Sequence, residues 1–105
     1  MINENYLESD NIKSLDKAGI RNLFKVYKET NEKEVRDILI EKHLYIAEIL
    51  AKKYANRGID YEDIYQVACI GLIYAIDRFD VDKGFEFSSF ATPTIIGEIK
   101  KYFRD

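Results

Sequence analysis

The sequence predicts an all-α protein, a small bundle of several helices. Apolar residues recur at helical spacing in four stretches, and no stretch alternates apolar and polar residues as a strand would. One proline and five glycines in 105 residues leave room for long helices. Hydrophobic residues make up 47 % and charged residues 33 %, an ordinary balance for a folded domain. One domain of this length can bury a modest core without disulfides or metals.

The chain begins with a polar segment, residues 1–13, which we expect to be flexible. Residues 14–105 are predicted to form the helical domain. Within it, the stretch 14–30 places apolar residues at loosely helical spacing and predicts a short amphipathic helix. Its apolar positions are Leu15, Ala18, Leu23, Val26 and Tyr27.

A second helix should open at Asn31, because Asn31 with Glu34 resembles a capping box. Its apolar stripe weakens near Lys42 and His43, where we expect a bend. Gly58 follows a run of basic residues and should end this helix.

A third helix is predicted from about residue 61 to residue 79, with Asp60 as its cap. Its core face should consist of Ile64, Ala68, Gly71, Leu72, Ala75, Ile76 and Phe79. The stretch 80–87 is a turn-rich connection. The last helix should bury Ala91, Ile95, Ile99 and Phe103 on one side.

The third helix carries a second line of residues beside its core face: Asp63, Gln66, Cys69, Ile70 and Ile73. A helix of a small bundle needs only one apolar stripe. Either this helix is central and buried all round, or the second line meets a partner helix. Asp63 and Gln66 favour a partner, because unpaired polar groups are costly in a core.

Three aromatic rings, Phe85, Phe87 and Phe90, fall within six residues at a loop-to-helix boundary. Such rings either fill the core or stack on unpaired bases. Ser88 and Ser89 can cap a helix or bond phosphates. Basic residues close the chain, and they either contact phosphates or complement the dipole of their own helix. These are Lys100, Lys101 and Arg104.

The composition excludes several classes of function. With one cysteine and one histidine, the chain can form neither an internal disulfide nor a Cys/His zinc site. No phosphate-cradling glycine loop or catalytic constellation is present, so we predict no cofactor and no enzyme. Signal-peptide features and apolar runs of membrane length are also missing, which predicts a cytoplasmic protein. The net charge of -3 confines any nucleic-acid contact to a local patch or to stacking.

Three motifs occur in order: "KKYANRG", then "DIYQ-x-x-x-IGL-x-x-AIDRFD", then "GFEFSSFAT". Because these motifs occur together and in this order, the stretch from Leu39 to Asp105 resembles conserved region 2 of bacterial RNA polymerase sigma factors. The ending "PTIIGEIKKYFRD" is similar to alternative sigma factors of spore-forming Gram-positive bacteria. It most resembles the general-stress and early-sporulation type, which kinase-like anti-sigma factors hold inactive.

The resemblance implies an all-α bundle with two tasks. One face binds the coiled coil of the polymerase's largest subunit, and it maps onto Asp63, Gln66, Cys69 and Ile73. The other task is to open promoter DNA at the minus-ten element, where the ring of Phe90 would stack at the place that a flipped-out adenine of the non-template strand leaves in the duplex. The residues implied in DNA contact are Phe85, Phe87, Ser88, Ser89, Phe90, Thr92, Lys100, Lys101 and Arg104.

The chain also departs from housekeeping members of that family. Pro93 and Thr94 stand where they carry two tryptophans, and Gly97 stands where they carry a glutamine that reads duplex sequence. We therefore expect weaker or more restricted melting. Thr92 and Pro93 also suggest a helix start, which would leave "FEFSSFA" less helical.

Because such factors continue through further domains, we interpret the chain as a fragment of a longer factor. As an alternative, the chain acts mainly as a protein-interaction module that an anti-sigma factor binds.

Overall fold

The computed structural model describes residues 16–55 and 58–104, and these residues form helices and connections without a strand. The prediction of an all-α fold is confirmed. The segment 1–13, expected to be flexible, lies outside the described residues, as do Leu15 and Arg57. The elements are α2 (Lys17–Thr30), α3 (Lys33–Ala55), α4 (Tyr61–Arg78), the short 3-10 helix η2 (Val81–Lys83) and α5 (Phe87–Arg104).

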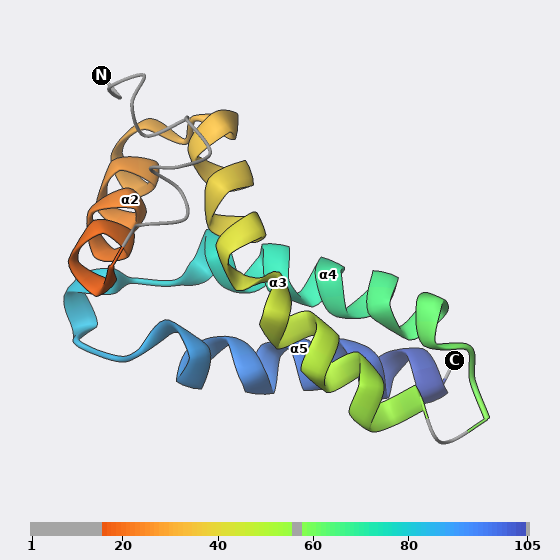
Figure 1. Ribbon diagram of the computed structural model, residues 1–105. Coiled ribbons are helices and arrows are strands. Elements are labelled where there is room, and N and C mark those ends of the chain that lie inside the picture. The colour runs from red at the N-terminus through yellow and green to blue at the C-terminus, as the bar shows by residue number, and fades with distance from the viewer. Residues whose placement is uncertain (1–15, 56–57, 105) are drawn as a thin grey trace.

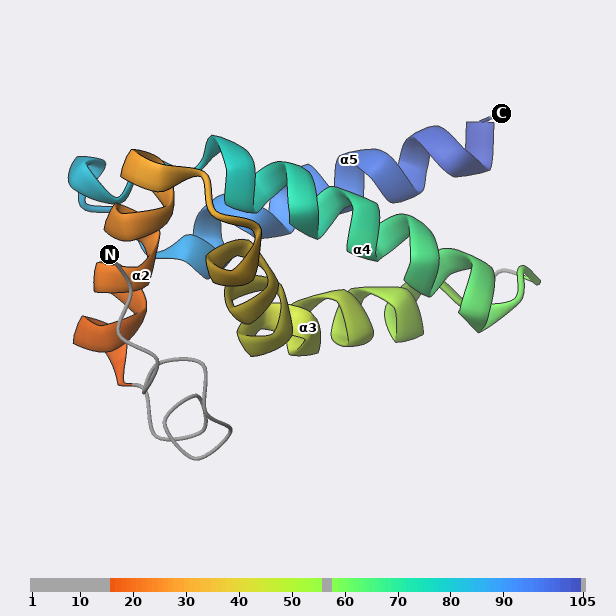
Figure 2. The same cartoon turned by 90° about the horizontal axis from the view of Figure 1, so that it is seen from above.

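Helix α4 is central, because it packs along both α3 and α5 (Figure 1). Helix α2 stands at one end of the molecule against α3 and η2, away from the end where α5 stops (Figure 2). The described part of the chain is elongated, with extents of 45 × 28 × 20 Å. This shape leaves one long side of α4 and much of α5 at the surface.

Helix α2 forms where the amphipathic stretch was predicted, and it buries Leu23 and Phe24. Its N-cap is Asp16, whose carboxylate accepts a hydrogen bond of 2.9 Å from the backbone N–H of Gly19. Asn31 does not open the second helix, so the predicted capping box is wrong. Instead Asn31 ends α2 in the left-handed conformation, with φ of 54°, a conformation that asparagine tolerates better than most residues.

Helix α3 changes direction about half-way along its length (Figure 1). His43 stands near the middle of this 23-residue helix, and its Nδ1 lies 2.7 Å from the backbone oxygen of Leu39. Side-chain contacts with a carbonyl four residues earlier often accompany bends. The bend expected near Lys42 and His43 therefore has a local cause in this contact.

The predicted core face of α4 is confirmed, except that Phe79 is the C-cap and only half-buried. Asp60 takes the N-cap position, although its side chain makes no capping bond. Gly71 brings α4 and α5 together, since a Cβ at Gly71 would lie 2.8 Å from the Cα of Ile95. The two helices can approach this closely only because residue 71 has no side chain.

Helix α5 runs without a break from Phe87 to Arg104, with Pro93 inside it. The prediction that Thr92 caps this helix, leaving "FEFSSFA" less helical, is wrong. A proline inside a helix removes one backbone hydrogen bond and costs about 3 kcal/mol. Burial of Phe87, Ala91, Ile95 and Ile99 along one side outweighs that cost.

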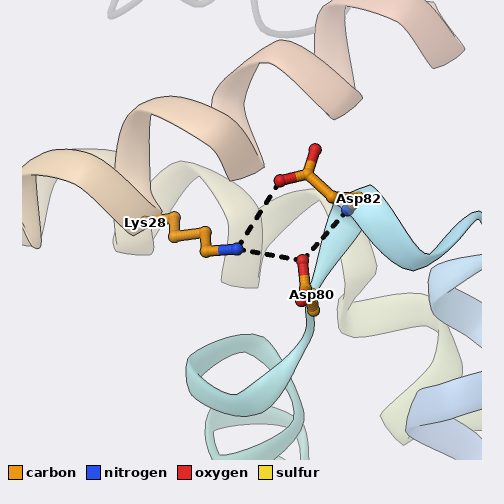
Figure 3. Close-up of polar contacts among 3 residues, drawn as sticks. All are labelled: Lys28, Asp80 and Asp82. Atoms are coloured by element: carbon orange, nitrogen blue, oxygen red, sulfur yellow. Dashed lines mark hydrogen bonds and ion pairs between the residues drawn. The ribbon is translucent and has the colours of Figure 1, made fainter.

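An ionic and hydrogen-bonded cluster fastens α2 to the connection after α4 (Figure 3). The ammonium of Lys28 lies 3.0 Å from a carboxylate oxygen of Asp80 and 3.6 Å from one of Asp82. Asp80 also accepts a bond of 3.0 Å from the backbone N–H of Asp82. Beside it, the hydroxyl of Tyr27 donates to Asp77. These contacts place α2 beside the segment that leads into α5.

Candidate docking face and nucleic-acid interface

The outer face of α4 points away from its core face and carries the second line of residues. Asp63, Gln66 and Ile70 are exposed, whereas Cys69 and Ile73 are half-buried. The interpretation that α4 is buried all round is therefore wrong. We call this surface the outer face of α4 and define it by Asp63, Gln66, Cys69, Ile70, Ile73 and Tyr74.

Apolar groups on the outer face are unusually open to solvent. Ile70 is 47 % exposed and Tyr74 is 39 % exposed. Sequence reasoning missed Tyr74, although its position four residues after Ile70 could have revealed it. The guanidinium of Arg78 lies 5.1 Å from the centre of the Tyr74 ring and leaves that ring at the surface. An apolar centre beside carboxylates suits a partner helix that carries basic residues at its edge.

Cys69 contributes to this face as a small apolar group. Burial raises the pKa of its thiol, the contact with Tyr65 offsets part of this rise, and the neighbouring carboxylate of Glu48 also raises the pKa. A thiol that stays protonated is a poor nucleophile and a poor metal ligand. The side chain of Cys69 therefore contributes apolar surface to this face.

A second feature is an open cavity of about 400 Å³ between α2, the middle of α3 and the start of α5. We call it the aromatic cavity, because rings from all three segments line it: Phe24, His43, Tyr45, Phe79, Phe85 and Phe87. Its volume lies within the roughly 300–1,000 Å³ range of ligand sites. Phe85 is 65 % exposed, which leaves its ring free to meet a ligand.

The three predicted stacking residues have different environments. Phe87 is only 7 % exposed, and its ring packs against Phe24 at 5.0 Å and Phe79 at 5.2 Å between centroids. Phe87 thus packs in the core, which is one of the two alternatives that the sequence left open for these rings. Its ring faces are covered by neighbouring rings. Phe90 is half-buried and lies 5.6 Å from Phe79. Only Phe85 presents most of its ring to solvent.

Charged side chains of both signs line the aromatic cavity. The cations are Lys17, Arg21 and Lys42, and the carboxylates are Asp16 and Glu86. Lys17 forms an exposed ion pair of 3.5 Å with Glu86, whereas Arg21 and Lys42 have no ion pair among the described residues. Sequence reasoning missed Arg21 and Lys42, because they come from helices distant in sequence from the aromatic segment. Their charges are available to a phosphate.

The hydroxyl residues of α5 lie near the cavity. Ser88 and Ser89 are exposed in the first turn of the helix, and Ser88 lines the cavity. The hydroxyl of Thr92 donates a bond of 2.8 Å to the backbone oxygen of Ser88. Thr92 therefore keeps only acceptor capacity for other contacts.

The basic residues Lys100, Lys101 and Arg104 are exposed near the end of α5. A rise of 1.5 Å per residue places this end roughly 25 Å from the first turn of the helix. Lys100 and Arg104 border a second, shallower hollow of about 630 Å³ with Tyr54, Gly97 and Phe103. The structure thus separates the predicted DNA contacts into one group at the cavity and one at the far end of α5.

Residues 16–55 and 58–104 contain neither a metal-binding cluster nor a membrane-spanning helix. No cluster of three histidine, cysteine or carboxylate side chains there could hold a metal ion. In the same part of the chain, every helix is too short or too polar to cross a bilayer.

The chain is thus an all-α domain with an exposed apolar helix face and a cavity lined by aromatic and charged side chains. Residues 39–105 match the family described as Sigma-70 region 2. The chain belongs to this family.

Three relatives illustrate the similarity. The RNA polymerase sigma-F factor of Kitasatospora aureofaciens is 51 % identical over 77 residues, which cover 72 % of this chain and 26 % of the relative. The sigma-F factor of Bacillus subtilis is 38 % identical over 77 residues, covering 73 % and 30 %. That of Priestia megaterium is 32 % identical over 103 residues, covering 98 % and 37 %. The chain thus spans about a quarter to two fifths of the length of these curated relatives.

Proposed function

We propose that this chain is the region of an alternative sigma factor that docks on RNA polymerase and engages the promoter minus-ten element in transcription initiation. The observation that carries the proposal is the aromatic cavity, with an exposed ring and two cations without ion pairs. Membership of the sigma-70 region 2 family supports it. Relatives named sigma-F and sigma-G factors in Bacillus subtilis favour the sporulation group.

Polymerase docks, in this proposal, on the outer face of α4. Ile70 and Tyr74 supply apolar area, which is worth about 25 cal/mol per Å² when a partner covers it. Asp63 and Gln66 at the N-terminal end of the face fix the register through charge and hydrogen bonds. Cys69 and Ile73, both half-buried, complete the contact with the coiled coil of the largest subunit.

Promoter DNA binds on the other surface as an opened non-template strand. Flipping a base out of the duplex costs a few kcal/mol, which contacts with the protein must offset. Phe85 offers a ring face worth roughly 1–3 kcal/mol per stacked base. From the cavity, the proposed path of the DNA strand runs past Ser88, Ser89, Phe90 and Thr92. Further along α5, the phosphates of the strand would contact Lys100, Lys101 and Arg104. Phe87 supports the cavity from within the core.

An anti-sigma factor is the alternative partner of the outer face of α4. The same exposed apolar groups suit it, and one surface cannot hold both partners at once. Occupation by an anti-sigma factor would therefore compete with polymerase and keep the domain inactive. Competition between the two partners for the wild-type chain would support this assignment.

The DNA proposal is tested by fluorescence anisotropy with a labelled single strand that carries a minus-ten sequence, with and without core polymerase. Phe85→Ala should weaken binding about 5- to 150-fold, the loss of one stacked base. The matched control is Tyr102→Ala, which removes an exposed ring (40 % exposed) at the far end of α5. Equal affinities of the wild type and the Phe85→Ala variant would contradict the proposal.

Polymerase docking is tested by a pull-down with the coiled-coil segment of the largest subunit. The double variant Asp63→Ala, Gln66→Ala should abolish capture, whereas Asn22→Ala with Glu29→Ala, two exposed positions on α2, should not. Failure of the folded wild-type chain to be captured would exclude this face as the polymerase site and favour an anti-sigma factor.

A further inference from the structure

A hollow of about 630 Å³ lies where α3 and α5 end, at the same end of the molecule (Figures 1 and 2). Tyr54 and Phe103 supply half-buried rings to it, and Lys100 and Arg104 supply exposed positive charge. We call it the terminal hollow and define it by these four residues and Gly97. The rings form its floor and the cations its rim. The proposed function uses the two cations but gives the rings no role.

Gly97 keeps the terminal hollow open. A glycine inside a helix is less favourable than an alanine, so its presence there needs a reason. At Gly71 the reason is the close approach of Ile95, but a Cβ at Gly97 would meet nothing within 4 Å. Packing within the described part of the chain therefore does not require a glycine at position 97. Its consequence is the hollow itself, because a larger side chain there would occupy the space beside Phe103.

The positive charges of the terminal hollow are not neutralised by neighbouring carboxylates. None of the described carboxylates lines this hollow, whereas carboxylates do line the aromatic cavity. The ion pairs found in 16–55 and 58–104 involve Lys17 and Lys28, so Lys100 and Arg104 have none there. The end of a helix carries only about half a negative charge, which two cations exceed. The hollow therefore offers surplus positive charge to an anionic partner.

The rings of the terminal hollow suit a branched aliphatic side chain better than a nucleobase. Two other rings adjoin Phe103, that of Tyr54 at 6.2 Å and that of Tyr102 at 6.4 Å between centroids. A base stacks on a free ring face, and these neighbours restrict access to the faces of Phe103. A leucine side chain needs no flat face and gains from any apolar area that it covers. A peptide with leucine between carboxylates thus matches floor and rim, whereas a DNA backbone matches only the rim.

We propose that the terminal hollow binds an acidic peptide segment of a partner protein, whose leucine side chain covers the two rings while neighbouring carboxylates pair with Lys100 and Arg104. Gly97 and Arg104 are separated by roughly 10 Å along the helix, at 1.5 Å per residue, and an extended peptide covers this length with about three residues. The carboxylates must therefore lie directly beside the leucine in sequence. Such a peptide competes with DNA for the two cations. Only this competition rests on the proposed function, and the peptide site itself does not.

The test uses the full 105-residue chain and fluorescein-labelled heptapeptides, followed by fluorescence anisotropy at low salt. The first peptide has a central leucine with three glutamates on each side, the second has glycine at its centre, and the third has glutamines in place of the glutamates. The wild type should bind the leucine peptide about 3- to 10-fold more tightly than the glycine peptide, which corresponds to about half of the free energy of burying a whole leucine side chain. The glutamine peptide should lose most of the affinity, because it carries no charge to pair with the cations.

Gly97→Leu fills the terminal hollow, and its Cβ meets no neighbour, so the helix should keep its packing. This variant should bind the leucine and glycine peptides equally. Glu29→Leu adds the same side chain at an exposed position of α2 and is the control, which should keep the preference for leucine. Lys100→Ala should weaken the binding of both glutamate peptides and keep the preference. It also serves if Gly97→Leu fails to fold, as checked by circular dichroism.

Equal binding of the leucine and glycine peptides by the wild type would overturn the proposal, as would a leucine preference that survives in folded Gly97→Leu. A labelled minus-ten strand tests the proposed function separately, and unlabelled leucine peptide should displace this strand from the wild type. Binding of the strand but of neither glutamate peptide would overturn the peptide site and leave the proposed function intact. A leucine preference without binding of the strand, with or without polymerase, would overturn the proposed function and support the peptide site.

Discussion

A histidine enclosed by aromatic rings makes the stability of this domain depend on pH. Burial lowers the pKa of folded His43 below its ordinary value of about 6.5, so the unfolded chain takes up the proton first as pH falls. Stability is therefore lost progressively once pH falls below about 6.5, until the folded pKa is reached. Above about pH 7.5 both states are neutral and the effect vanishes.

Urea denaturation of the wild type should thus show a lower free energy of unfolding at about pH 5.5 than at about pH 7.5. His43→Phe should show a smaller difference between these two pH values. His43 is the only histidine in the chain, so no other histidine masks the comparison. The contact with Lys28 lowers the pKa of Asp80. Protonation of this carboxylate therefore reduces the free energy of unfolding only at a lower pH than protonation of His43 does. An unchanged pH dependence in His43→Phe would contradict the prediction.

Phe85 and Phe87 show how much about a side chain's environment can be predicted from the spacing of residues in the sequence. The sequence places three rings together, and two of them, Phe85 and Phe87, line the aromatic cavity. This grouping does not tell which ring is in the core, because that depends on Phe24 and His43, which come from other helices. The cations Arg21 and Lys42 escaped prediction for the same reason.

At the scale of elements, the contact between α4 and α5 depends on Gly71. A Cβ there would lie 2.8 Å from the Cα of Ile95, which is backbone and cannot rotate away. Gly71→Ala should therefore lower the free energy of unfolding by up to about 2 kcal/mol, an overpacking cost of about 1–3 kcal/mol less the helical gain of alanine of about 1 kcal/mol.

Gly97 in α5 is the matched control, because a Cβ there would meet nothing within 4 Å. Gly97→Ala should raise the free energy of unfolding by about 0.5–1 kcal/mol through helix propensity alone. Chemical denaturation of both variants measures the difference. A stabilising Gly71→Ala would show that α4 and α5 can separate without loss.

Local sequence patterns predicted where the helices lie, but they predicted two of the helix boundaries incorrectly. Asn31 has the right residue type for an N-cap, yet it is used as the left-handed end of α2. Pro93 has the right type for a helix start, yet α5 continues through it because its buried side is already packed against α4 from Phe87 onward. In both cases packing between helices overrides a local preference, and packing is not visible in a short window of sequence.

At the scale of the whole molecule, the net charge of -3 conceals a separation of charge. Carboxylates accompany the outer face of α4, whereas cations gather at the aromatic cavity and at the end of α5. The two proposed partners therefore meet surfaces of different character. The sequence analysis named some residues of each surface, because those residues follow one helix or one short segment. The cavity as a whole could not be predicted in this way, because three distant segments form it.

This separation predicts how DNA binding responds to salt. Each phosphate contact to a single strand contributes a slope of about -0.7 to the dependence of log affinity on log salt. Lys100→Ala with Arg104→Ala should therefore reduce the slope by about 1.4. Phe85→Ala should lower the affinity and leave the slope unchanged, because stacking releases no counterions. Lys33→Ala removes an exposed charge at the start of α3, away from the end of α5, and is the control (Figure 1). Equal slopes for the wild type and the double variant, measured by anisotropy across a salt series, would place the strand away from the C-terminal end of α5 and confine DNA contact to the cavity.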